Sequence, residues 1–206
     1  MKVLVTAGPT REPIDPVRFL SNRSSGRMGF SIVRGLVAAG HEVMLVSGPV
    51  ALRAPKLAAH ARIETAEEML MACRRLWPHC DAVIAAAAVA DWRPAHASAD
   101  KLKRTADAAP VLELVPNPDI LAELATTKGD RIAIGFALET GDGRVEALRK
   151  LRVKGLDFIA LNGPEAQGAE RATLRLFDAA GRERVLGPSR KDALARALIR
   201  HTLGPA

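Results

Sequence analysis

The sequence contains no tyrosine, and its five phenylalanines and two tryptophans bring the aromatic content to only 3%. Proteins that bind single-stranded nucleic acid stack the bases on aromatic side chains, as RNA-recognition sheets also do. The shortage of aromatic residues therefore argues against both classes. The net charge of +7 still needs an explanation, and phosphate-bearing small molecules, a duplex backbone and ordinary solubility all stay open.

Cysteine is equally scarce, with Cys73 and Cys80 the only two in the chain. Their spacing is not C-x-x-C, and no second pair exists that would complete a zinc site. The five histidines are also scattered, without the spacing of metal ligands. We interpret both cysteines as reduced thiols, which is typical of a reducing compartment.

Long hydrophobic runs are absent as well. No uncharged apolar run approaches the roughly 18 residues of a membrane-spanning helix. The apolar run at residues 3–7 is too short for a signal sequence, and the alanine-rich run Ile84–Val89 indicates a buried strand. We therefore expect a cytoplasmic protein with no membrane partner.

What the sequence does contain is a regular alternation of strand and helix signals. Short apolar runs predict strands at residues 3–7, 43–47, 81–87, 131–136 and 157–161. Periodicity and capping signals predict helices that end near residue 40 and that span 65–76, 117–127, 145–153 and 189–201. The third of these is opened by Asn117 as N-cap and Pro118 as the first helical residue. The alternation predicts an α/β fold with a Rossmann-like, mostly parallel sheet and helices on both faces.

The C-terminal region differs in character. Residues 172–177 and 182–186 flank the turn sequence at 178–181 and predict a C-terminal β-hairpin. We find no internal repeat and no low-complexity linker in the sequence. We therefore expect a single domain that spans residues 1–206.

The segment after the first predicted strand, residues 8–29, reads GPTREPIDPVRFLSNRSSGRMG in place of a compact G-x-G-x-x-G. Rossmann-like domains bind ligands outside the carboxyl ends of their strands, and a long loop at such a place is usually functional. Ser24, Ser25 and Gly26 open the next predicted helix, so backbone amides there would hold an anion. An ordinary serine N-cap explains the same residues equally well.

This segment closely resembles the signature of the phosphopantothenoylcysteine synthetase family, the phosphopantothenate–cysteine ligases of coenzyme A biosynthesis. The resemblance continues in the family's order through AAAVADWRP at 86–94, KLKR at 101–104, NPDIL at 117–121, GFALET at 135–140 and KLRVKGLDFIALN at 150–162. In most bacteria this activity forms the C-terminal half of a fusion with a flavin-dependent decarboxylase. The resemblance covers only the synthetase half, and it implies either a stand-alone synthetase or a domain separated from a decarboxylase partner.

The resemblance implies a two-step reaction. CTP, accompanied by Mg²⁺, activates the carboxylate of 4′-phosphopantothenate as an acyl-cytidylate, and the amine of cysteine then forms the amide. It also implies a homodimer in which the partner helps to close each site. Such chemistry requires cations, amides and Mg²⁺ rather than a Ser-His-Asp nucleophile.

Three residues match family positions that act on the substrate. Asn22 matches the residue that contacts the activated acyl group, and Arg18 matches an arginine that reaches the substrate from the neighbouring subunit. Lys101 matches the first lysine of a flap, which is needed to form the acyl-cytidylate. Lys103 and Arg104 are weaker candidates, and Arg104 stands where the family commonly has lysine. Apart from the resemblance, a turn asparagine and solvated surface cations would explain these residues.

The other matches imply the rest of the site. Substrate contacts would come from Arg18, Asn22, Ser24, Ser25 and Gly26, and nucleotide contacts from Ala85, Ala86, Ala87, Asp91, Lys101, Pro118, Asp119, Ile120, Leu121, Phe136, Lys150 and Lys154. The 118–121 backbone would recognise the base on which Phe136 packs, and the two α-helical lysines, four residues apart on one face, would bind phosphates. Asp91 would lie near the nucleotide or the metal, although a turn aspartate is an equally good interpretation. Asn162 precedes Gly163 and Pro164 where the family has an Asn-Asp pair, which leaves contacts from that loop open.

Two other functions stay as alternatives. An NADP-dependent Rossmann-type oxidoreductase would have a short glycine-rich turn after Ala7 and, in the common Tyr-Lys reductases, a tyrosine, and the sequence has neither. A duplex-binding protein would gather its basic residues on one exposed element, whereas many of them here fall in the predicted ligand-end loops and in the helix at 145–153. We therefore expect small-molecule substrates and no nucleic-acid partner.

Overall fold

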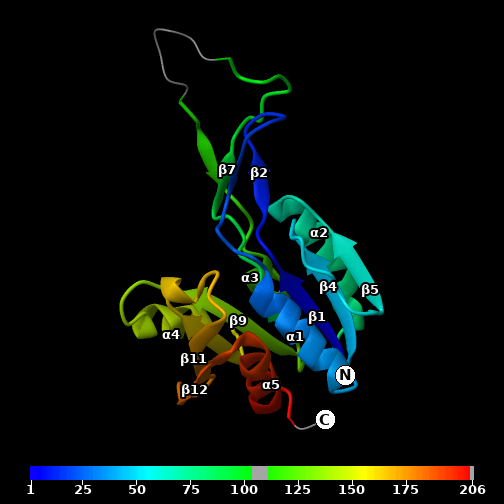
Figure 1. Cartoon of the computed structure of the whole chain (residues 1–206), viewed down its shortest axis with the longest axis vertical. Coiled ribbons are helices and arrows are strands. Elements are labelled where there is room, and N and C mark those ends of the chain that lie inside the picture. Colours follow the sequence, from blue (N-terminus) through cyan, green and yellow to red (C-terminus); the bar gives the residue numbers. More distant parts are fainter. Residues whose placement is uncertain (104–110, 205–206) are drawn as a thin grey trace.

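An eight-stranded sheet forms the centre of the protein in the computed structural model, which describes residues 1–103 and 111–204 (Figure 1). In spatial order its strands are β12 (Glu183–Arg190), β11 (Arg171–Asp178), β10 (Phe158–Asn162), β9 (Ile132–Leu138), β6 (Ala82–Ala85), β1 (Lys2–Ala7), β4 (Glu42–Ser47) and β5 (Ala59–Arg62). All neighbours from β10 to β5 are parallel, and β11 pairs antiparallel with both β10 and β12. The predicted mostly parallel sheet and C-terminal hairpin are confirmed.

Helices cover both faces of this sheet. They are α1 (Arg27–Ala38), α2 (Ala66–Leu76), α3 (Ile120–Thr126), α4 (Arg144–Val153) and α5 (Lys191–Thr202), with short 3₁₀ turns η1 (Trp77–His79) and η2 (Pro164–Ala166). Successive residues of a strand point to opposite faces. Val3 and Val5 of β1 therefore join a core with α1 and α5, while Leu4 joins a second core with α2, α3 and α4. The predicted placement of helices on both faces is confirmed.

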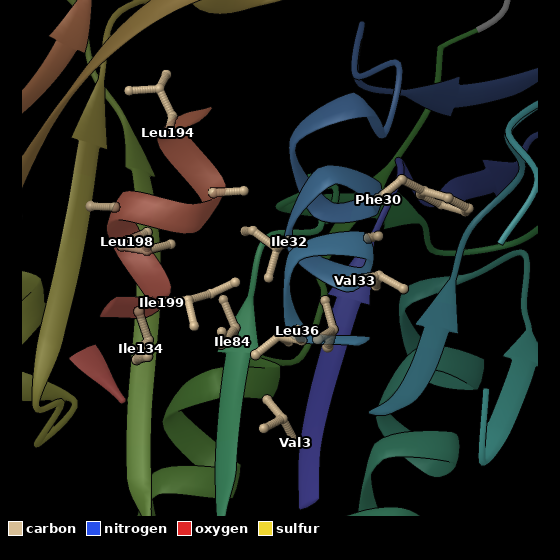
Figure 2. Close-up of a cluster of buried hydrophobic side chains, with 14 of the residues drawn as sticks. Val3, Phe30, Ile32, Val33, Leu36, Ile84, Ile134, Leu194, Leu198 and Ile199 are labelled. Carbon is tan, nitrogen blue, oxygen red and sulfur yellow. The ribbon is translucent and has the colours of Figure 1, made fainter. Parts of the chain in front are cut away.

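Figure 2 shows the first core, in which α1 and α5 pack side by side on the middle strands. Ile32 and Leu36 of α1, Leu198 of α5, and Ile84 and Ile134 of the sheet are all 0% exposed. Burial of an aliphatic side chain of this size stabilises the fold by about 1.5–3 kcal/mol. This packing holds the first helix against the last helix of the chain.

Polar contacts join the middle of α1 to the first turn of α5. The Ser31 hydroxyl donates to the Asp192 carboxylate at 2.5 Å, and the Arg34 Nη2 donates to the same oxygen at 2.9 Å. Both helices begin at the edge where the parallel strands have their carboxyl ends, because Gly26 before α1 packs on Gly8 after β1 and Lys191 of α5 reaches the Ala166 carbonyl after β10.

The start of α3 differs from the sequence prediction. Its N-cap is Asp119, whose Oδ1 accepts a hydrogen bond from the Ala122 N–H at 3.0 Å. The prediction of Asn117 as N-cap is wrong, because the Asn117 side chain instead donates to the Ala90 carbonyl at 2.8 Å. The Asn117 side chain thus makes a tertiary contact with the neighbouring segment and does not cap the helix, although local capping rules would predict that it does.

Strand β5 is an addition to the predicted sheet. It pairs with β4 at the edge, and its residues alternate between half-buried and exposed. The strand contains the polar residues His60 and Arg62 and has no continuous apolar run. Its apolar residues are only alanines, which have a low preference for strands, so the sequence does not clearly indicate a strand.

Two short strand pairs project beyond the sheet as an arm, which we define as residues 11–21, 92–103 and 111–116 (Figure 1). β2 (Arg11–Pro13) pairs with β3 (Phe19–Ser21), β7 (Trp92–Pro94) pairs with β8 (Leu114–Pro116), and β2 also contacts β7. The sequence predicts only irregular loops here. Strands of three residues are too short to produce an alternating hydrophobic pattern.

Gly29 in the first turn of α1 packs directly on β1. A Cβ at this position would lie 2.5 Å from the Ala7 Cβ and 3.1 Å from the Ala7 Cα. We expect Gly29→Ala to lower the free energy of unfolding by roughly 1–3 kcal/mol, the usual cost of overpacking, as measured by urea denaturation. In the control Gly35→Ala, the new methyl group meets only the end of the Ile199 side chain, at 2.8 Å. Equal losses in the two variants would contradict this explanation.

Candidate active site

A pocket of about 610 Å³ opens at the carboxyl edge of the sheet. Helices α1 and α5 border it from one face of the sheet, and α3 and α4 border it from the other. It gathers most of the predicted site residues: Asn22, Ser24, Ser25, Gly26, Ala85, Ala86, Ala87, Asp91, Pro118, Asp119, Ile120, Leu121, Phe136, Lys150 and Lys154. Arg18 and Lys101 are not among its lining residues.

The start of α1 faces this pocket without a side-chain cap. The N-cap is Gly26, in the left-handed conformation with φ 73°, and no side chain of the described residues caps the helix. The Ser24 hydroxyl instead accepts from the Gly26 N–H at 3.3 Å. The interpretation of these serines as an ordinary N-cap is therefore wrong. The first amides of α1 stay available to an anionic ligand.

The alanine-rich segment after β6 forms one wall of the pocket. The Ala86 N–H donates to the Thr6 carbonyl at 3.1 Å, and the Ala88 N–H donates to the Gly8 carbonyl at 2.9 Å. The Ala88 carbonyl accepts from the Asn22 Nδ2 at 3.0 Å. These bonds hold the segment in place, orient the Asn22 carboxamide at the pocket, and leave a backbone with small side chains that a ligand can approach closely.

A second wall is formed by the segment 117–121 beside Asp91. The Asn117 N–H donates to the Asp91 carbonyl at 2.8 Å, which fixes the two segments against each other. Phe136 on β9 lines the same pocket as the backbone of residues 118–121. An aromatic ring and a run of backbone donors and acceptors are the groups that recognition of a nucleobase requires.

Lys150 and Lys154 lie along one side of α4 and both line the pocket. Each is paired with a carboxylate. The Lys150 Nζ lies 2.6 Å from the Glu139 Oε1, and the Lys154 Nζ lies 2.7 Å from the Asp119 Oδ2. The positive charge of each lysine is therefore balanced within the protein.

Arg18 and Lys101 instead lie together on the arm, where the buried carboxylate of Asp15 connects their segments. The Asp15 Oδ2 accepts from the Arg18 Nε at 2.9 Å and from the Leu102 N–H at 3.1 Å. The Arg18 Nη2 in turn donates to the Leu102 carbonyl at 2.7 Å. This network ties Arg18 to the residue that follows Lys101, whose own side chain is exposed.

Sequence reasoning overlooked Asp15, although an aspartate followed by Pro16 is a turn signal. Lys103 is exposed next to this network. Arg104, the other weaker candidate, lies outside the described residues.

The network around Asp15 predicts a dependence on pH. The Arg18 guanidinium holds the pKa of Asp15 well below its usual value, and the N–H groups of Val17, Arg18 and Leu102 add to this effect, while burial opposes it. Such a carboxylate stabilises the fold above its unfolded pKa of about 3.9, and this contribution is lost as the pH falls. We expect the difference in Tm between the wild type and Asp15→Asn, measured by calorimetry, to narrow below about pH 4. A Tm difference that stayed constant from pH 7 to pH 3 would contradict the stabilising role assigned to the ionised Asp15 carboxylate.

Neither the cysteines nor a metal-binding cluster adds a reactive group to the described part of the chain. Cys73 and Cys80 are free and buried, and burial raises the pKa of Cys73 to about 12 and that of Cys80 to about 11. Within residues 1–103 and 111–204, no three histidine, cysteine, aspartate or glutamate side chains are arranged to hold a metal. In that same part, every helix is too short or too polar to cross a membrane.

Comparison with known proteins decides the family. The DNA/pantothenate metabolism flavoprotein C-terminal domain family matches residues 1–204. The chain belongs to this family. The coenzyme A biosynthesis bifunctional protein CoaBC of Escherichia coli is 39% identical over 206 residues, and that of Bacillus subtilis is 44% identical over 168 residues. These alignments cover 97% and 81% of this chain but only 50% and 41% of the relatives, so the chain spans about half of their length or less.

Two solved structures have the same fold as this chain. The crystal structure of the C-terminal domain of CoaBC has a TM-score of 0.83 and 37% identity, and the match covers 97% of this chain and 92% of that one. A Cab2 mutant in complex with phosphopantothenate-cysteine has a TM-score of 0.83 at 17% identity, with 98% and 85% covered. The resemblance found in the sequence is confirmed, and the oxidoreductase alternative is not favoured.

Proposed function

We propose that this chain is a phosphopantothenate–cysteine ligase of coenzyme A biosynthesis, with residues 1–206 forming one catalytic domain in the cytoplasm. The observation that carries the proposal is the meeting of four distant segments in one pocket: the loop at 22–26, the alanine-rich segment at 85–91, the segment 117–121 and the lysines of α4. The relatives named CoaBC, and the Cab2 structure that holds phosphopantothenate-cysteine, support the same activity.

The pocket suits a nucleotide, which we assign as CTP. The backbone of Pro118–Leu121 recognises the edge of the base, and Phe136 packs on its face. The backbone at Ala85–Ala87 allows the ribose and α-phosphate to approach closely. Lys150 and Lys154 add positive charge that attracts the nucleotide.

In the first step, a carboxylate oxygen of 4′-phosphopantothenate attacks the α-phosphorus of CTP. The bond to the β-phosphate breaks and pyrophosphate leaves. The Asn22 carboxamide lies where it can donate a hydrogen bond to an oxygen of the reacting acyl phosphate without adding a charge. The first amides of α1 face the same space, and they favour negative charge there.

In the second step, the amine of cysteine attacks the acyl carbon, CMP leaves with the electrons of the broken bond, and the amine proton passes to solvent. The protein's task is to hold the acyl-cytidylate in position and to exclude competing water. Asn22 keeps its contact with the acyl group through both steps.

Mg²⁺ would neutralise charge on the triphosphate when it is bound. Asp91 and Asp119 are the carboxylates among the lining residues of the pocket, and Asp119 is paired with Lys154. Mg²⁺ commonly takes one or two protein carboxylates and fills its other positions with water and phosphate oxygens. Asp91 therefore fits a metal that arrives with the nucleotide.

We also propose a homodimer in which the arms complete each other's sites. The arm exposes large apolar side chains, among them Val17, Phe19, Trp92 and Leu114, which are 60%, 45%, 54% and 44% exposed. Contiguous exposed apolar surface typically marks an interface. Arg18 and Lys101 lie on this arm and outside the pocket of their own chain, so a partner's pocket is where they would act. The bifunctional relatives further suggest a decarboxylase domain or partner.

The direct test combines the protein with 4′-phosphopantothenate, cysteine, Mg²⁺ and either CTP or ATP, and measures pyrophosphate release. We expect release to require 4′-phosphopantothenate and to be faster with CTP. Product should appear as phosphopantothenoylcysteine only when cysteine is also present. Pyrophosphate release that ignores 4′-phosphopantothenate would exclude the proposed activity.

A further inference from the structure

Two cations on the α1–α5 side of the pocket have no role in the site described above. Arg27 is the first residue of α1, and Lys191 is the first residue of α5. Both line the pocket. They come from the face of the sheet opposite to the one that carries Lys150 and Lys154. The pocket therefore has cations on both sides.

The two pairs of cations, Arg27 with Lys191 and Lys150 with Lys154, differ in the groups that their side chains contact. In the described part of the chain, Arg27 and Lys191 reach only backbone carbonyls of one short segment. The Lys191 Nζ lies 3.1 Å from the Ala166 carbonyl, and the Arg27 Nη1 lies 3.5 Å from the Gly168 carbonyl. Within the described residues, neither forms an ion pair with a carboxylate. The acid next to Lys191 is already engaged, because Asp192 binds Ser31 and Arg34.

This arrangement is electrostatically unfavourable without a ligand. Burial lowers the pKa of Lys191, and the neighbouring positive charge of Arg27 lowers it further. Two cations that meet without an anion reduce stability, whereas an anion bound between them would reverse the effect. The uncapped first turn of α1 adds positive potential at the same place.

We propose that Arg27 and Lys191 form a subsite for the terminal phosphates of the nucleotide. The inference rests on the proposed function for the identity of the ligand, and on the contacts of the described residues for the site itself. The lysines of α4 are already balanced by Glu139 and Asp119, so the proposal gives Arg27 and Lys191, rather than Lys150 and Lys154 alone, the binding of phosphates that the resemblance implies. In the first step, Arg27 and Lys191 hold the pyrophosphate as its bond to the α-phosphorus breaks.

Binding of inorganic tripolyphosphate to the full chain tests the subsite without any need for catalysis. We expect Arg27→Gln and Lys191→Gln each to weaken binding about 10-fold or more, as loss of a charge-assisted contact to phosphate does, in isothermal titration calorimetry. Arg27→Lys should keep most of the affinity. Arg200→Gln removes the same charge from an exposed position on α5 outside the pocket, and it should leave binding unchanged.

A comparison of CTP with CMP separates this role from general damage to the pocket. The Arg27 and Lys191 variants should bind CTP less tightly than the wild type but bind CMP equally well, because CMP lacks the phosphates assigned to the subsite. Equal weakening of both nucleotides would overturn the assignment, because it would show that Arg27 and Lys191 do not act through the terminal phosphates.

Three results would overturn the subsite: no binding of tripolyphosphate by the wild type, an equal loss in Arg200→Gln, or a loss in Lys150→Gln and Lys154→Gln that exceeds the loss in the Arg27 and Lys191 variants. Failure of the proposed function looks different. In that case tripolyphosphate binding still falls in the Arg27 and Lys191 variants, while the wild type shows no pyrophosphate release that depends on 4′-phosphopantothenate.

Discussion

We expect Asn22→Asp to lower the rate of pyrophosphate release by about 10²- to 10³-fold, the usual cost of losing one preorganised donor to a developing oxyanion. The substitution replaces the Nδ2 donor with a carboxylate oxygen. It also places that oxygen against the Ala88 carbonyl, which now accepts the Nδ2 hydrogen bond at 3.0 Å. Negative charge beside an acyl phosphate opposes the reaction twice, by removing a donor and by repelling the phosphoryl oxygens.

The loss should appear in kcat more than in KM for the nucleotide, because Asn22 acts on the reacting acyl phosphate and the base is held elsewhere. Arg23→Gln serves as the control, since it changes an exposed neighbour in the same loop. Circular dichroism should be unchanged in both variants because the Asn22 side chain is exposed. Wild-type turnover by Asn22→Asp would remove Asn22 from the mechanism.

Lys101→Gln is expected to reduce formation of the acyl-cytidylate by about 10²-fold, the scale on which loss of a transition-state cation slows phosphoryl chemistry. Stability should not change, because the side chain is exposed and its segment is held through Leu102 by Asp15 and Arg18. Lys56→Gln removes the same charge from another exposed loop and should retain full activity. A normal rate in Lys101→Gln would show that the arm lysine has no part in the first step.

Mixing the two inactive chains tests where Lys101 acts. If each site takes Asn22 from one chain and Lys101 from its partner, a mixed dimer has one intact site. Random pairing makes about half of the dimers mixed, so about a quarter of the wild-type activity should return when Asn22→Asp and Lys101→Gln are co-expressed. If both residues act within one chain, no activity returns, and the sharing of sites through the arms is disproved.

Much of the fold could be predicted from local patterns. The buried strands read as short apolar runs because both faces of a parallel sheet are covered by helices. The arm, β5 and the start of α3 could not be predicted in this way. Three-residue strands have no measurable period, β5 alternates polar and half-buried residues, and Asn117 bonds to Ala90 instead of capping the helix.

The residues of the candidate site also divide into those that the sequence could identify and those that it could not. Asn22, the alanine-rich segment and the lysines of α4 could be named from motifs, and the structure brings them to one pocket. Asp15, Arg27 and Lys191 could not be selected, because no local sequence pattern shows which distant segments their side chains contact. Their importance comes from contacts with segments distant in the sequence.

By itself, the sequence determined the α/β class, the family and most of the residues around the pocket, because these depend on local apolar patterns and contiguous motifs. Its excess of positive charge was also visible from the start. Only the tertiary structure decided which cations are balanced by carboxylates, as Lys150 and Lys154 are, and which reach only carbonyls among residues 1–103 and 111–204, as Arg27 and Lys191 do. The partner of a charge is set by the packing of elements far apart in the chain, and no local pattern contains that information.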